Sequence, residues 1–93
     1  MKEMKMYDCK GTELKKGDFV QLVKGKPPYI NSAMRKGFVL KVSYCADRGF
    51  NRSNPHIVIF LTSKSGNRLY QNGVTSDEIL KVNYDVKKRK IIS

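Results

Sequence analysis

The chain is poor in the residues from which catalytic and metal sites are built. It has one histidine, two cysteines and no tryptophan among 93 residues. Structural zinc sites need four ligands, mostly cysteine and histidine, so His56, Cys9 and Cys45 are too few to form one. The histidine begins an expected strand, and no serine and aspartate accompany it in a catalytic pattern. We therefore expect no enzyme activity, no metal and no cofactor.

Long apolar runs are also missing. A membrane-spanning helix needs about 18 consecutive apolar residues, and no such stretch occurs. The first residues, MKEMKMYDCKG, lack the apolar centre of a secretory signal. We expect a cytoplasmic protein with no membrane partner, in which both cysteines stay reduced. The short chain is rich in lysine and asparagine, which suits a phage protein that acts in the host cytoplasm.

Acidic residues are scarce, and the resulting charge is the strongest functional signal. Nineteen Lys and Arg side chains face eight Asp and Glu side chains, which gives a net charge of +11. Residues 85–93 hold four basic side chains and one acidic side chain, so the rest of the chain keeps +8. Such a surface attracts nucleic acid, an anionic membrane or an acidic protein. A basic protein without a polyanionic partner is the plain alternative.

No long segment shows helical periodicity, and short apolar runs between turn signals predominate. These runs predict an all-β fold: a small barrel of five or six antiparallel strands, with one short helical turn (75–78) before the last strand. The barrel is expected to occupy residues 1–86, followed by a mobile basic tail, 87–93. In that tail, Ile91 and Ile92 could dock on the barrel edge or on a partner. The expected strands are 4–9, 19–23, 38–45, 56–62, 68–71 and 80–86.

Alternation within the expected strands assigns side chains to faces of the sheet. In residues 38–45 it puts Tyr44 on the same face as Phe38 and Leu40. Tyr84 alternates with polar neighbours in the last expected strand. Both tyrosines are therefore expected in the core.

Residues 14–45 carry a pattern of glycines and apolar strands. A Gly-Asp pair precedes one apolar strand, a Gly-Lys pair follows it, and a second glycine opens the next apolar strand. The residues are Lys16-Gly17-Asp18, Val20, Leu22, Gly25-Lys26, Lys36-Gly37 and Val39-Leu40-Lys41-Val42.

This pattern resembles the KOW branch of the SH3-like barrels. Members of that family occur in transcription-elongation factors and ribosomal proteins, where they bind RNA, DNA or the transcription machinery. The resemblance therefore implies an SH3-like barrel with such a partner. The inserted segment KPPYINSAMR departs from the family, whose loop at this place is short.

Nucleic-acid binding calls for Lys and Arg near aromatic side chains, because cations hold phosphates and rings stack on bases. Four parts of the chain combine basic residues with rings or with further basic residues: the two long loops, the 63–68 hairpin with the residues after it, and the tail. Few polar groups suited to reading base edges stand out, so we expect low sequence specificity. The candidate nucleic-acid-binding residues are Lys24, Lys26, Tyr29, Arg35, Lys36, Arg48, Phe50, Arg52, Lys64, Arg68, Tyr70, Lys87, Lys88, Arg89 and Lys90.

The sequence leaves the kind of partner open. Duplex DNA, single strands and structured RNA all fit the basic loops. A protein-interaction module is an alternative, because Tyr29, Phe50 and Tyr70 could form a peptide groove and the positive surface could hold an acidic partner such as a transcription complex. A structural subunit of a ribosome or a phage particle is a third possibility. Only binding to nucleic acid is expected to fall steeply with salt.

Overall fold

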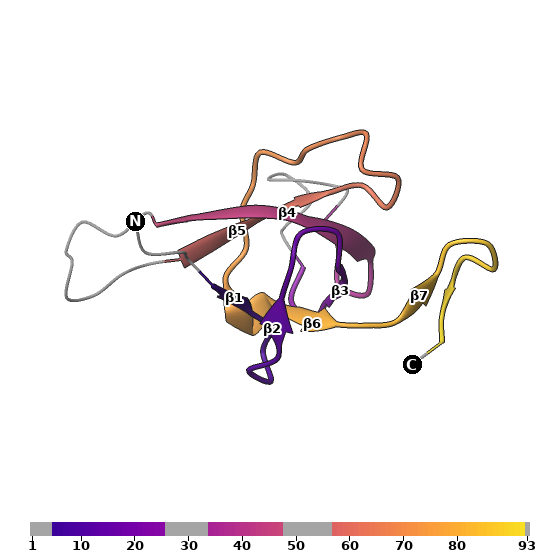
Figure 1. Ribbon diagram of the computed structural model, residues 1–93, viewed down its shortest axis with the longest axis horizontal. Helices are drawn as coiled ribbons and strands as arrows, with labels where there is room; N and C mark the ends of the chain where they lie inside the picture. The colour runs from indigo at the N-terminus through magenta and orange to yellow at the C-terminus, as the bar shows by residue number, and fades with distance from the viewer. Residues whose placement is uncertain (1–4, 26–33, 48–56, 93) are drawn as a thin grey trace.

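The computed structural model describes residues 5–25, 34–47 and 57–92, and nearly all of its regular structure is antiparallel β (Figure 1). This confirms the expected all-β class. Among these described residues, the one helical element is a 3₁₀ turn, η1, at Ser76–Glu78. The strands are β1 (Met6–Tyr7), β2 (Glu13–Leu14), β3 (Phe19–Leu22), β4 (Val39–Asp47), β5 (Ile57–Thr62), β6 (Ile79–Lys81), β7 (Tyr84–Asp85) and β8 (Lys90–Ile91).

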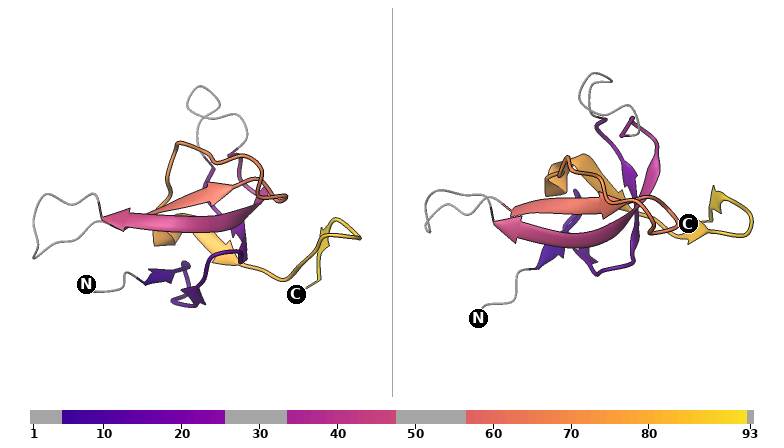
Figure 2. Two further views of the ribbon diagram at one scale, coloured as in Figure 1. Left: turned by 45° about the horizontal axis from the view of Figure 1, so that its top comes forward. Right: turned by 90° about the horizontal axis from the view of Figure 1, so that it is seen from above.

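The central unit is a four-stranded antiparallel sheet in the order β5-β4-β3-β6. β3 pairs with β4 on one side and with β6 on the other, so a strand late in the chain closes against an early one. Single bridges from Ile59 to Val74 and from Thr62 to Leu69 extend the pairing beyond β5. In Figure 2, β4 and β5 run across the direction of β3, so the sheet curls into a small barrel-like shape.

The concave side of this sheet holds the core. Val20 and Leu22, two residues apart on β3, are both fully buried, as the alternation predicts. Ile59 and Leu61 on β5, the edge strand at the other side of the sheet from β6, are also fully buried. The buried cluster is completed by Leu14, Met34, Leu40, Val42, Val74 and Ile79.

A β-bulge in β4 overturns the expectation for Tyr44. The register with β5 shifts between Val42 and Tyr44, so Ser43 is an extra residue in the strand. One inserted residue exchanges the two faces of all that follows. Tyr44 is consequently 45% exposed and stacks on Phe60, while Cys45 packs against the core in its place.

The N-terminal hairpin of β1 and β2 is tied to the sheet by a buried carboxylate. Asp8 is 3% exposed. Its Oδ1 accepts hydrogen bonds from the backbone N–H groups of Lys10 and Thr12 at 3.0 and 2.8 Å. Its Oδ2 accepts one from the N–H of Lys81 in β6, at 2.9 Å. Asp8 therefore links two segments that are 73 residues apart in sequence.

Three expected strands are shorter than the sequence indicates. Within the described part of 4–9, only Met6–Tyr7 forms a strand. The expected strand 68–71 makes only the bridge at Leu69. The expected strand 80–86 is split, because β6 ends at Lys81 and the next pairing begins at Tyr84. The helical turn is confirmed: η1 follows Thr75, whose N–H donates to Glu78 Oε2 at 2.8 Å.

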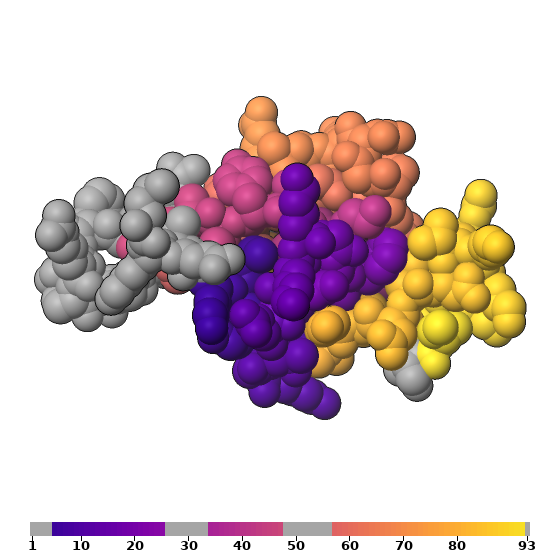
Figure 3. All heavy atoms as spheres, in the orientation of Figure 1, coloured from indigo at the N-terminus to yellow at the C-terminus, as the bar shows by residue number. Residues whose placement is uncertain are grey.

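The residues expected to form a mobile tail instead close a hairpin. Tyr84 pairs with Ile91 and Asp85 with Lys90. Asp85 Oδ1 accepts the N–H groups of Lys87 and Lys88, which stabilises the tight connection. Figure 3 shows these C-terminal residues, in yellow, at one end of the molecule. Ile91 thus pairs within a two-stranded sheet that is separate from the four-stranded one, and the basic run lies in a formed turn.

Candidate functional site

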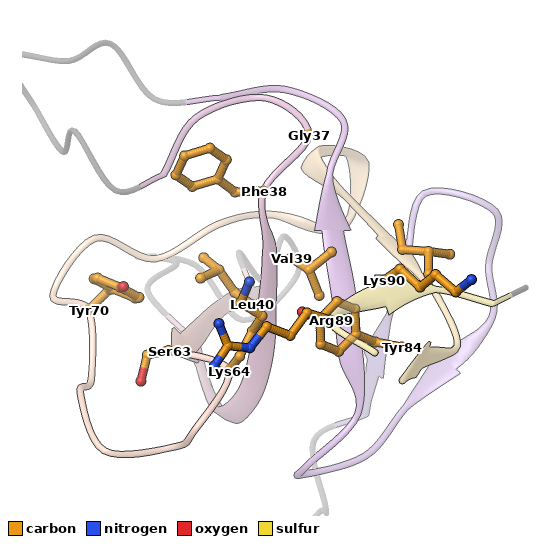
Figure 4. Close-up of a pocket in the computed structure, with 11 residues that line it drawn as sticks. Gly37, Phe38, Val39, Leu40, Ser63, Lys64, Tyr70, Tyr84, Arg89 and Lys90 are labelled. Carbon is orange, nitrogen blue, oxygen red and sulfur yellow. The ribbon is translucent and has the colours of Figure 1, made fainter. Parts of the chain in front are cut away.

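A groove of about 480 Å³ lies where the start of β4, the 63–70 segment and the C-terminal hairpin meet. Val39 and Leu40, both buried, form its floor. Figure 4 shows the side chains around this floor, contributed by three separate parts of the chain. The other lining residues are Gly37, Phe38, Ser63, Lys64, Tyr70, Tyr84, Arg89, Lys90 and Ile91.

The lining combines rings with positive charge. Three of its residues are aromatic and three are basic, and none of the described residues that line it is acidic. The acidic residue nearest in sequence to the lining is Asp85, which follows Tyr84. Its Oδ1 accepts hydrogen bonds from the two N–H groups of its own turn. The groove therefore offers apolar surface and a positively charged lining to a ligand.

Phe38 stands at the rim on a backbone that is fixed on both sides. The N–H of Leu22 donates to the Phe38 carbonyl at 2.9 Å, and the N–H of Gly37 donates to the Leu22 carbonyl at 2.8 Å. Gln21 Nε2 also donates to the Gly37 carbonyl at 3.1 Å. Gly37 has φ of +91°, a conformation that other residues rarely adopt, which explains the glycine at this turn.

Tyr84 forms the opposite side of the groove and is held by two neighbours. Its ring centroid lies 5.2 Å from that of Phe19 in a tilted arrangement. Lys64 Nζ lies 5.3 Å from the Tyr84 ring centroid, within the range of a cation–π contact. The expectation of a core position for Tyr84 is therefore only half right: the side chain is half-buried and lines the groove.

Tyr70 packs partly against the core and also lines the groove. The Arg68 guanidinium lies 5.6 Å from its ring centroid. Arg68 therefore adds a fourth cation close to the lining.

The structure brings some of the sequence-predicted residues together and separates others. Lys64, Tyr70, Arg89 and Lys90 line the groove, and Arg68 contacts Tyr70. Lys87 and Lys88 lie in the adjoining turn, and Arg35 and Lys36 are exposed just before Gly37. Predicted residues that lie outside the described part of the chain are Lys26, Tyr29, Arg48, Phe50 and Arg52.

Lys24 does not join the groove. Its Nζ forms an ion pair with Asp77 Oδ2 at 3.1 Å. A hydrogen bond from Thr75 and the contact with Lys24 both lower the pKa of the Asp77 carboxyl. Lys24 thus already has an acidic partner.

Sequence reasoning missed Phe38 and Tyr84 as site residues. Both belong to expected strands with alternating apolar side chains, and that pattern assigns them to the core. The available signal for Phe38 is its place directly after the Lys36-Gly37 turn, because the first residue after a turn is often less covered than the strand interior.

The described residues contain neither a cluster of metal ligands nor a membrane-spanning helix. No group of three or more His, Cys, Asp or Glu side chains among them could hold a metal ion. None of their helical segments is long and apolar enough to cross a bilayer. Both cysteines are free thiols, and burial raises the pKa of Cys45.

Comparison with known proteins found no match. No family model, no curated protein and no solved structure matches the chain.

Proposed function

We propose that this protein is a non-enzymatic nucleic-acid-binding module. The observation that carries this proposal is the groove: three rings and three cations line it, with no acid among its described residues. Cations neutralise phosphates, and aromatic faces contact bases or sugars. The net charge of +11 would draw a polyanion toward this surface from any direction.

In this proposal, the cations of the groove hold phosphates and the rings contact bases or sugars. Arg89 and Lys90 stand on the hairpin and Lys64 on the facing segment, so phosphates can be held from two sides. None of the described residues that line the groove is Asn, Gln, Asp or Glu, which favours low sequence specificity. The resemblance to KOW-type barrels is in keeping with this function and remains part of the proposal.

Charge substitutions test the proposal directly. Arg89→Gln with Lys90→Gln removes two groove cations, and Lys15→Gln with Lys16→Gln removes two exposed cations from the turn before β3 as a matched control. Fluorescence anisotropy with labelled DNA and RNA, titrated across a salt series, measures affinity and slope. We expect the groove variant to lower the log–log salt slope by about 1.5, the value for two lost phosphate contacts.

The control variant is expected to change the slope much less. Equal effects of the two variants would place binding on the whole basic surface and remove the groove from the proposal. No binding of any nucleic acid at low salt would contradict the function itself. The search would then turn to an acidic protein partner or to a role as a subunit of a larger particle.

A further inference from the structure

We infer that the groove takes an unpaired nucleotide and stacks its base on Phe38, so that the protein prefers single-stranded to duplex nucleic acid. This inference rests on the proposed function and adds the form of the nucleic acid. The ligand chemistry is a free base face next to a phosphate, which DNA and RNA share.

The Phe38 ring is unusually free for its size. Its side chain is 46% exposed, although the next two residues, Val39 and Leu40, are buried. Within the described part of the chain, no other ring and no cation contacts it, whereas Tyr44, which is equally exposed, stacks on Phe60. An open aromatic face beside an apolar floor is the arrangement on which bases stack.

The platform is also fixed before any ligand arrives. The Phe38 carbonyl and the turn that precedes it are both hydrogen-bonded to β3. A ligand would therefore spend little free energy on ordering this backbone. At Phe38 itself, only rotation of the side chain would have to be restricted on binding.

Size and charge favour a single nucleotide over a double helix. A volume of about 480 Å³ is that of a pocket for a small molecule, so it can hold one or two nucleotide units. In a duplex, neighbouring base pairs cover the faces of each base, and only edges are accessible in the grooves. Lys64, Arg89 and Lys90 can hold the phosphates that flank a splayed base, as Figure 4 shows by their places around the floor.

The test compares a single-stranded oligonucleotide, its duplex, and a strand of the same length with abasic sites, each as DNA and as RNA where it can be made. The variant is Phe38→Leu, which keeps an apolar side chain but removes the flat face. The control is Tyr44→Leu, an equally exposed aromatic outside the groove lining. Circular dichroism of each variant establishes that it is folded.

Phe38→Leu is expected to weaken single-strand binding roughly 5- to 30-fold, which corresponds to the loss of one stacked base. The salt slope should not change, because no phosphate contact is lost. The abasic strand should bind the wild type more weakly than the normal strand, and Phe38→Leu should not weaken it further. Tyr44→Leu should leave all affinities unchanged.

Equal affinity for the single strand and the duplex, or unchanged single-strand binding by Phe38→Leu, would overturn the inference. If the groove cations still governed the salt slope in that case, the proposed function would stand. Absence of binding to every probe at low salt would overturn both.

Discussion

Asp8 offers the sharpest test of how this small barrel is held together. Its carboxylate is nearly inaccessible and accepts three backbone hydrogen bonds, one of which reaches β6. In Asp8→Asn the amide has one accepting oxygen instead of two. In either orientation its NH₂ group then faces at least one backbone N–H, and the preferred orientation loses the bond to Lys81.

Hydrogen bonds to charged groups contribute about 1.5–3 kcal/mol each, so we expect Asp8→Asn to lower the free energy of unfolding by about 2 kcal/mol. Asp8→Ala removes both acceptor oxygens and all three hydrogen bonds, and should cost about 3 kcal/mol or more. For a domain of this length, a loss of about 2 kcal/mol lowers Tm by roughly 8–16 °C. Because small domains have about 5–15 kcal/mol in total, the change is large enough to measure accurately.

The assay is urea unfolding followed by circular dichroism at neutral pH. Asp85→Asn is the matched control, because Asp85 uses one oxygen for both of its turn hydrogen bonds and an asparagine oxygen can replace it. We expect the control to change the unfolding free energy by less than about 0.5 kcal/mol. A loss below about 0.5 kcal/mol for Asp8→Asn would refute the role of Asp8 as the link to β6.

The pH dependence gives an independent check. Burial alone would raise the pKa of the Asp8 carboxyl, but the N–H groups of Lys81, Thr12 and Lys10 outweigh it and hold the pKa below its usual value. A carboxylate with a lowered pKa stabilises the fold fully above its unfolded pKa, about 3.9. That stability is lost as the pH falls through the folded value. The difference between wild type and Asp8→Asn should therefore shrink below about pH 4.

Two further predictions test the packing. The exposed Cys9 thiol should react with a disulfide reagent at least about tenfold faster than Cys45, because burial raises the pKa of the Cys45 thiol. Peptide mass spectrometry after partial labelling measures the two rates. Equal rates would contradict the packing of Cys45 against the core. Gly73→Ala should lower the free energy of unfolding in urea by about 1–3 kcal/mol, because a Cβ there would collide with Val58 Cγ1. An unchanged unfolding midpoint would show that Val58 and β5 move aside without destabilising the fold.

The positions of β3, β4 and β5 were predictable because local pattern determines them. Val20 and Leu22 alternate with half-buried neighbours on β3, and the β-branched run of β5 needs no tertiary information to be recognised. The bulge at Ser43 has no comparable signature. Strict alternation assigns Tyr44 to the core face. Only the pairing of β4 with β5 shows that β4 contains one extra residue.

The groove could not be found by sequence reasoning, since it joins three parts of the chain that are distant in sequence. Lys64 and Tyr70 were recognised as candidates from local composition, and so were Arg89 and Lys90. What composition could not show is that Phe38 lines the same groove with its ring exposed. Exposure of an apolar side chain in an alternating strand depends on which element covers it, and that is settled only in three dimensions.

The C-terminal hairpin belongs to the site as much as the barrel does, and this decides how the function must be tested. Tyr84 pairs with Ile91, and Arg89, Lys90 and Ile91 all line the groove. A chain that ends at Tyr84 would lose four cations, two of which line the groove, together with one wall of the groove and the strand partner of Tyr84. Loss of binding on such truncation would fit a non-specific basic arm and a built groove equally well. Substitution of Arg89 and Lys90 keeps the wall formed by Ile91, so it separates the contribution of charge from that of shape.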